Sequence, residues 1–377
     1  MVFGTFGILS TELGFVGILP QIASYFNVTL DMAGLFISGF SFVIMIGSLV
    51  IPLIVGKCNR KHLFVLVLLF MSIFSFAGGL THNFYVALAC RIISAFFYPA
   101  YISIAFTVAG ELVDPVDAPR AVSKVVMGFS AGEILGLPIC TFFANHGGYP
   151  MAMFALGFLN LVSCIVTLLF FPSIEGHVDV NFKNQLKLSR KPILILSAIG
   201  VAVFSTGFCL YYNYAASFLQ IISHITGEFI TFTLLLGGVM SIVGSWLTGR
   251  LLVKIPGKTV IVAPVVICIN LALLLLFATS GNMIFMIVLS ALFGFFEGVF
   301  TNIIQYWIIT AIPQASEFAN GVFMSMLNVG VTLGAVIGGF LIADIGLMAI
   351  IPASIIIILL SIILFASRMY KFSKTTS

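Results

Sequence analysis

The stretch GFSAGEILGLPICTFFANHGG, residues 128–148, carries a glycine every four residues inside an apolar run. Gly128, Gly132 and Gly136 advance by about 40° per step around an α-helix, so they stay on one helix face. Within a membrane, such a stripe of small residues lets another helix backbone approach closely. Pro138 removes a main-chain donor and allows the helix to bend. The stretch therefore predicts a membrane-spanning helix that packs tightly against a neighbour.

The composition extends this prediction to the whole chain. Of the 377 residues, 61% are hydrophobic and 7% are charged, and the mean hydropathy is +1.24. A soluble domain carries about 25% charged residues. Apolar stretches of about 20 residues recur along the sequence, which is typical of a polytopic helical membrane protein. The fold class is therefore an all-α membrane protein.

Hydropathy predicts twelve transmembrane helices in two six-helix halves. The longest connection, 173–191, is read as a linker between an N-terminal bundle, 1–172, and a C-terminal bundle, 192–377, with a short tail. The predicted spans are 2–20, 34–56, 62–80, 84–110, 120–144, 149–172, 192–219, 229–252, 259–279, 283–311, 318–343 and 346–367.

The two halves read as repeats of one another. At an offset of 198 residues, Gly132 pairs with Gly330 and Gly136 pairs with Gly334. Because six is an even number, both copies cross the membrane in the same direction. Parallel six-helix repeats are a transporter architecture, with the substrate site near the midplane at the interface of the repeats.

The basic residues predict the orientation. Arg91 lies inside the predicted span 84–110, and the other fifteen lie on one side. By the positive-inside rule, that side is cytoplasmic, and it includes both termini and the linker 173–191. We expect a multi-pass protein of the plasma (inner cell) membrane. The fifteen residues are Lys57, Arg60, Lys61, Arg120, Lys124, Lys183, Lys187, Arg190, Lys191, Arg250, Lys254, Lys258, Arg368, Lys371 and Lys374.

Four segments resemble motifs of the major facilitator superfamily. STELGFVGILPQIA (10–23) resembles the first-helix motif, and ALACRIISAFFYPA (87–100) resembles the motif with a buried arginine, here Arg91. GFSAGEILGLP (128–138) is similar to the glycine-rich antiporter motif, and LYYNYAASFLQ (210–220) resembles an aromatic stretch of span seven. The resemblance covers essentially the whole chain. It is greatest to the twelve-span drug:proton antiporter branch, which also holds sugar and nucleoside exporters.

The chain departs from the family pattern in the loop between spans two and three. PLIVGKCNRK (52–61) keeps a basic pair but has Gly56 where the family has an aspartate. The second-half copy, GRLLVKIPGK (249–258), has Val253 at the acidic position. In relatives these aspartates help to latch the cytoplasmic side, so the chain lacks residues of the usual gating latch.

Four charged residues lie deep in apolar runs: Glu12, Arg91, Glu133 and Glu297. A charge at the bilayer centre costs on the order of 3 kcal/mol or more, so each is a candidate functional residue. The alternative is that each is paired and only holds helices together. Glu12 and Arg91 each lie about 12 Å inside the outer surface by helix rise, which makes an ion pair feasible. We predict that the three carboxylates are protonatable coupling sites and that Arg91 tunes Glu12.

A second set of polar and aromatic residues is predicted to bind substrate. Thr301 and Gln305 share a helix face with Glu297, because they follow it at spacings of four and eight residues. For the polar residues of spans ten and eleven the alternative role is interhelical hydrogen bonding, worth roughly 0.6 kcal/mol each. For the span-seven residues the alternative is an interfacial aromatic belt. The full set of candidates is Tyr211, Asn213, Tyr214, Thr301, Gln305 and Asn328.

Nothing in the sequence indicates an enzyme, a cofactor or a metal site. The five histidines lack metal-ligand spacing, and the six cysteines lie singly and read as small buried hydrophobes. A Walker motif is not present, so we expect coupling to an ion gradient. The net charge of +4 is explained by topology and does not indicate nucleic-acid binding.

The sequence thus predicts a secondary transporter that exports a small organic molecule in exchange for protons by alternating access. Its expected partners are that substrate, protons and the lipid bilayer. The sequence does not specify the substrate or the oligomeric state. Two alternatives stay open: a proton-coupled uptake symporter, and a non-transporting receptor or scaffold on the same fold.

The topology can be tested by labelling. Cysteines placed at Asn83, His146 or Asn282 should react from outside the cell with an impermeant reagent, because these positions lie in connections without basic residues. Tags in the linker 173–191 and at the C-terminus should be accessible only from the cytoplasm. Labelling of the linker from outside would overturn the orientation.

Overall fold

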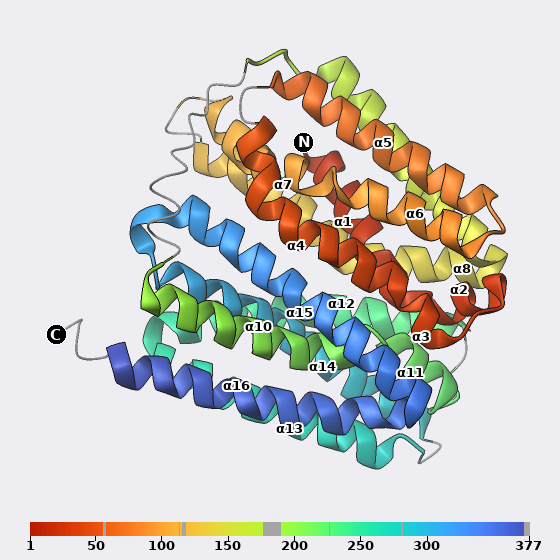
Figure 1. The fold of residues 1–377 in the computed structure, drawn as a ribbon, viewed down its shortest axis with the longest axis vertical. Coiled ribbons are helices and arrows are strands. Elements are labelled where there is room, and N and C mark those ends of the chain that lie inside the picture. Colours follow the sequence, from red (N-terminus) through yellow and green to blue (C-terminus); the bar gives the residue numbers. More distant parts are fainter. Residues whose placement is uncertain are drawn as a thin grey trace. The chain divides into compact units, whose positions relative to one another are not determined.

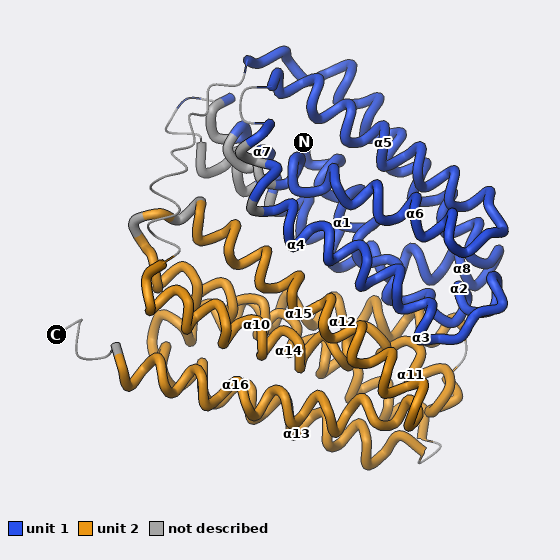
Figure 2. Tube along the Cα trace, in the orientation of Figure 1, with its two compact units in different colours: residues 1–180 blue, residues 181–377 orange. Residues whose placement is uncertain are grey.

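The computed structural model describes residues 1–55, 58–112, 114, 118–175, 190–225, 227–279 and 282–372. Within these ranges the regular secondary structure is entirely helical. The chain forms two compact units, Met1–Val180 (unit 1) and Asn181–Ser377 (unit 2), shown in different colours in Figure 2. The predicted linker 173–191 includes their boundary, and its residues 176–189 lie outside the described residues.

Unit 1 begins with a short broken segment and ends in a very long helix (Figure 1). Its elements are α1 (Val2–Leu13), the 3₁₀ helix η1 (Gly14–Gly17), α2 (Leu19–Phe26), α3 (Leu30–Ala33), α4 (Leu35–Val55), α5 (Arg60–Leu80), α6 (Phe84–Ala95), α7 (Tyr98–Glu111) and α8 (Ala118–Phe170).

Unit 2 repeats this pattern with fewer interruptions. Its elements are α10 (Pro192–Tyr212), α11 (Ala215–Ile221), α12 (Gly227–Lys254), α13 (Pro256–Phe277), α14 (Met283–Ile309), η2 (Pro313–Ala315), α15 (Ser316–Asp344), η3 (Leu347–Ala349) and α16 (Ile350–Phe372).

The described residues contain ten helices that are long and apolar enough to cross a membrane, or eleven if the bent pair at the N-terminus is one span. One of them, within α8, covers both predicted spans 120–144 and 149–172. The backbone of α8 is non-helical at Gly147 and Gly148, and the φ of +69° at Gly148 favours glycine. Counting the two arms of α8 separately gives the predicted twelve.

Three spans that were predicted as continuous helices are broken. The span 2–20 bends by 71° between η1 and α2, and the span 84–110 stops at Ala95 before α7 begins. Pro20 and Pro99 lie in the first turn of the helix that follows each break. Because proline has no N–H, it cannot bond to the carbonyl four residues earlier. The span 192–219 breaks after Tyr212, between α10 and α11.

The glycine stripe of α8 packs directly on α1, as the sequence predicts. A Cβ atom built on Gly132 would lie 2.7 Å from the main-chain oxygen of Phe6, and one on Gly136 would lie 2.5 Å from Cα of Ser10. Both contacts are with backbone, which cannot move aside as a flexible side chain can. The stripe therefore fixes how closely α1 and α8 approach.

Unit 2 uses the repeated glycines in the same way. A Cβ atom on Gly330 would clash with Ser205, and one on Gly334 would lie 2.8 Å from the main-chain nitrogen of Leu210. Both contacts join α15 to α10, which are the second-half counterparts of the first arm of α8 and of α1. The repeat found in the sequence is thus also a repeat of helix packing.

Gly136→Ala should destabilise the protein by about 1–3 kcal/mol, because overpacking of a tight contact forces the backbones apart. Thermal unfolding of the detergent-solubilised protein measures this effect. Gly249→Ala is the matched control, since no atom lies within 4 Å of a Cβ built on Gly249 in α12. Equal stability of both variants would show that the contact between α1 and the glycine stripe of α8 tolerates a methyl group.

Candidate functional site

Arg91 binds the end of a broken helix. Its side chain, on α6, is only 4% exposed and donates from Nη1 to the main-chain oxygen of Thr11 at 2.6 Å and from Nη2 to that of Glu12 at 2.9 Å. These carbonyl groups belong to the last turn of α1, where the α-helical hydrogen bonding stops. The carboxy-terminal end of a helix also carries partial negative charge. Arg91 therefore caps α1 both by hydrogen bonds to its free carbonyl groups and by its positive charge.

Two aromatic rings enclose the same guanidinium. Its carbon atom Cζ lies 3.8 Å from the ring centroid of Phe15 in η1 and 3.6 Å from that of Phe40 in α4. A desolvated cation over an aromatic face gains about 2 kcal/mol or more. Because guanidinium is planar, it can stack on rings while its edge donates hydrogen bonds. Arg91 thus joins α6, α1, η1 and α4.

This arrangement differs from the predicted ion pair between Arg91 and Glu12. The guanidinium does reach residue 12, but it bonds to the main-chain oxygen and not to the carboxylate. The prediction assumed a continuous helix, in which that oxygen would already accept a bond from within the helix. The break after Leu13 makes the carbonyls available. The Glu12 carboxyl group still lies within electrostatic reach of Arg91.

Glu12 and Glu133 lie on two helices of unit 1, α1 and α8, that pack against one another. Both side chains are half-buried, and they interact electrostatically with one another across the contact between α1 and α8. The buried Tyr98, in the first turn of α7, lies beside both. The sequence prediction did not include Tyr98, although it follows Arg91 by seven residues, or about two helical turns.

A second polar link, from the second arm of α8, also holds the end of α1. Asn160, fully buried in the second arm of α8, donates from Nδ2 to Oγ1 of Thr11 at 2.8 Å. Thr11 in turn donates to the main-chain oxygen of Gly7 at 2.8 Å. Asn160 is a polar residue in an apolar run of the sequence. That exception indicated a buried polar contact, but the sequence prediction did not use it. The Thr11 position is therefore held through both its side chain and its carbonyl.

Glu297 belongs to unit 2, where it lies on α14. It is half-buried on α14, next to Gly298, where a Cβ would lie 2.6 Å from the main-chain nitrogen of Ser245 in α12. Glu297 lies within electrostatic reach of Cys209 in α10. It therefore sits on a helix that packs closely against its neighbour, as Glu133 does in unit 1.

The polar residues that follow Glu297 on α14 are half-buried. Thr301 shares this partial exposure, and Gln305 donates to Oδ1 of Asn320 in α15 at 3.3 Å. Asn328, by contrast, is 1% exposed and donates to the main-chain oxygen of Met324, within its own helix. The face of α14 thus retains accessible polar surface, whereas Asn328 is enclosed within unit 2.

The three candidates of span seven are buried between helices of unit 2. Asn213 donates to the main-chain oxygen of Val331 at 3.0 Å, and Tyr214 donates to that of Ala335 at 2.7 Å. Tyr211 packs edge-on against Phe293 of α14, with ring centroids 4.8 Å apart. For these three residues the alternative to substrate binding was an interfacial aromatic belt, but in the structure they are buried and Asn213 and Tyr214 make interhelical hydrogen bonds.

The described residues hold no group of three or more His, Cys, Asp or Glu side chains that is arranged to bind a metal ion. The described side chains that converge in unit 1 are suited to proton exchange and to electrostatics. They comprise two carboxyl groups, a phenol and a guanidinium that is held by main-chain oxygens.

The model of the Major Facilitator Superfamily matches residues 1–285. The chain belongs to the Major Facilitator Superfamily. It is a multi-pass membrane transporter by family and fold, and not an enzyme.

Solved structures share this fold at low sequence identity. A bacterial homologue of the human lysosomal transporter Spinster has a TM-score of 0.75 at 13% identity, over 99% of this chain and 96% of that chain. The nucleoside transporter NupG has a TM-score of 0.72 at 14% identity, over 99% and 100%. The human organic anion transporter MFSD10 (TETRAN) has a TM-score of 0.66 at 14% identity, over 96% and 98%.

Arg91→Lys should lower the free energy of unfolding by about 1.5–3 kcal/mol, because an ammonium group cannot bridge two carbonyls between two rings and one charged hydrogen bond is lost. Chemical or thermal unfolding in detergent measures this. Arg250→Lys is the matched control, because Arg250 is exposed and stacks only on Trp246, at 3.9 Å. Equal losses in the two variants would contradict the capping role.

Proposed function

We propose that this transporter exports a small organic molecule in exchange for protons, by alternating access of its two units. The proposal rests on one observation. The carboxyl groups of Glu12 and Glu133 lie within electrostatic reach of one another in unit 1, while the neighbouring Arg91 donates to main-chain oxygens. The cation that would otherwise pair with a carboxylate is thus engaged by the backbone.

Neighbouring carboxyl groups are suited to coupling. Because two like charges repel, proton uptake by Glu12 depends on the charge of Glu133, and the reverse also holds. The charge of Arg91 adds a constant positive potential at the same place, and the phenol of Tyr98 lies beside the Glu12 carboxyl group. A change in water access to the site, which alternating access implies, therefore changes proton occupancy.

The substrate site is proposed to include the polar face of α14. Glu297, Thr301 and Gln305 are half-buried on that face, which leaves them surface for contact with a ligand. Tyr211, Asn213, Tyr214 and Asn328 stay predictions. Their burial within unit 2 supports a role in shaping the site through packing more than direct contact with substrate.

The proposal also includes the membrane in which the protein lies and the side on which its termini lie. The positive-inside rule supports cytoplasmic termini and a plasma (inner cell) membrane location. Among the solved structures of similar fold, NupG is a nucleoside transporter and MFSD10 is an organic anion transporter. Both are small organic molecules, and this breadth supports the class of substrate without selecting a member.

Compounds that become toxic to a strain from which the gene has been deleted identify candidate substrates for direct transport assays.

Proton exchange can be measured in proteoliposomes that contain a trapped pH-sensitive dye. Addition of a transported compound should drive protons in the direction opposite to the compound. Proton movement in the same direction would identify an uptake symporter. A compound that binds without moving protons or itself would identify a receptor on the same fold.

Glu133→Gln should abolish proton-driven transport but leave substrate binding and counterflow exchange largely intact, because the amide keeps the shape of the side chain and cannot carry the proton. Glu12 and Tyr98 are the titratable groups beside it, and Arg91 is the charged group beside Glu12. Glu228→Gln, at the exposed first turn of α12, is the matched control. Loss of binding would make Glu133 a substrate ligand instead, and no change in either activity would remove it from the mechanism.

A further inference from the structure

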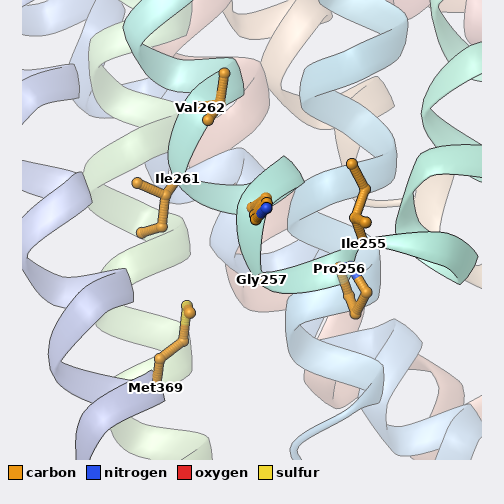
Figure 3. Close-up of a pocket in the computed structure, with 7 residues that line it drawn as sticks. Ile255, Pro256, Gly257, Ile261, Val262 and Met369 are labelled. Carbon is orange, nitrogen blue, oxygen red and sulfur yellow. The ribbon is translucent and has the colours of Figure 1, made fainter.

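An open groove lies at one end of unit 2, where α12 passes into α13 beside the end of α16. Its volume is about 560 Å³. Met369 of α16 lies across from Ile261 of α13, and in this view Gly257 lies to one side of both, with Pro256 and Ile255 beyond it (Figure 3). The charged residue of the lining is Lys258. The lining of the groove is thus apolar, with a single positively charged side chain, that of Lys258.

Positive charge surrounds this end of unit 2 without acidic residues to balance it. Lys254 ends α12, Lys258 lies in the first turn of α13, and Lys371 lies in the last turn of α16. All three are exposed. Neither α13 nor α16 contains an acidic residue, and Glu228, the one in α12, is at the far end of that helix. The described helices around the groove therefore present a net cationic rim.

Large apolar side chains are exposed next to this rim. Val253 and Tyr370 are each 85% exposed, and Val262 is 54% exposed. In a membrane-spanning unit such side chains lie against lipid, and the lysines mark the level of the headgroups, to which their amino groups extend. A ligand that matches both features has an anionic head and an acyl tail.

We propose that this groove binds an anionic glycerophospholipid. The phosphate lies at Lys258, with Lys254 and Lys371 supplying further positive potential, and the first methylene groups of one acyl chain lie along Ile261 and Met369. Each basic residue near a membrane surface attracts anionic lipid appreciably, and basic pockets between helices hold such headgroups.

The start of α13 adds to this potential. Ile255 occupies the position before the helix and supplies no side-chain cap, and Pro256 follows it. The first N–H groups of α13 are therefore not capped by a side chain, and the amino-terminal end of a helix carries partial positive charge. This charge has the same sign as that of Lys258 and lies in the same helical turn.

The test uses the intact protein in a neutral detergent, titrated with phosphatidylglycerol or with phosphatidylcholine of the same acyl chains. Native mass spectrometry counts the bound lipid. Phosphatidylglycerol should bind more tightly than phosphatidylcholine. Lys258→Gln should weaken phosphatidylglycerol binding about five-fold, the effect expected of one basic residue beside an anionic headgroup. Lys124→Gln, which removes an exposed lysine from α8 in unit 1, should leave binding unchanged.

A second pair of variants tests the groove without changing charge. Gly257→Leu fills it, because a Cβ on Gly257 already points to within 3.1 Å of Cε of Met369. It should weaken lipid binding at least as much as Lys258→Gln does. Gly249→Leu adds the same side chain at an open position of α12 and should have no effect.

Three results would overturn the proposal. The first is equal binding in the groove variants and their controls. The second is equal affinity for phosphatidylcholine, which would make the groove a general acyl-chain contact. The third is full displacement of the lipid by inorganic phosphate, which would make the site one for a free anion. Because the assay involves no transport, its outcome is independent of the proposed proton exchange.

Discussion

The bond between Arg91 and the broken end of α1 is the constraint on which the rest of unit 1 depends. A helix that stops inside a membrane leaves carbonyl groups that water cannot satisfy. Arg91 supplies the donors from α6, and Phe15 and Phe40 supply the faces that shield its charge. The same contact fixes the position of residue 12, and so it places one carboxyl group beside Glu133.

The two repeats anchor the corresponding break by different means. In unit 2, α10 also stops, but the residue 198 positions after Arg91 is Leu289, which is apolar and buried. There the neutral side chains of Asn213 and Tyr214, at the break, donate to main-chain oxygens of the neighbouring α15 and so hold the break against that helix. Unit 2 has a buried arginine at a different place: Arg368 lies over Trp307 and bonds to the end of α14. Unit 1 is thus the repeat whose first helix ends at a charged centre.

The sequence predicted the features that depend on composition and on the regular spacing of residues along a helix. It missed the features that depend on where a helix stops. The membrane fold and the seam at Gly132 and Gly136 follow from hydropathy and four-residue spacing. The partner of Arg91 did not follow, because equal depth suggested a side-chain pair while the break at Leu13 offered a main-chain one. Proline and glycine near that break were visible signals, but the bend of 71° is a property of packing in three dimensions.

The seam and the cap together determine how α1 can move. Along its length α1 lies against α8 with backbone contacts at Gly132 and Gly136, and at its end it is bonded to Arg91 of α6 and, through Thr11, to Asn160. Sliding α1 would break all of these contacts at once, because none is made by a flexible surface side chain. Such contacts favour a unit that moves as one body. The proposed proton exchange at Glu12 and Glu133 would then act on unit 1 as a whole and not on its internal shape.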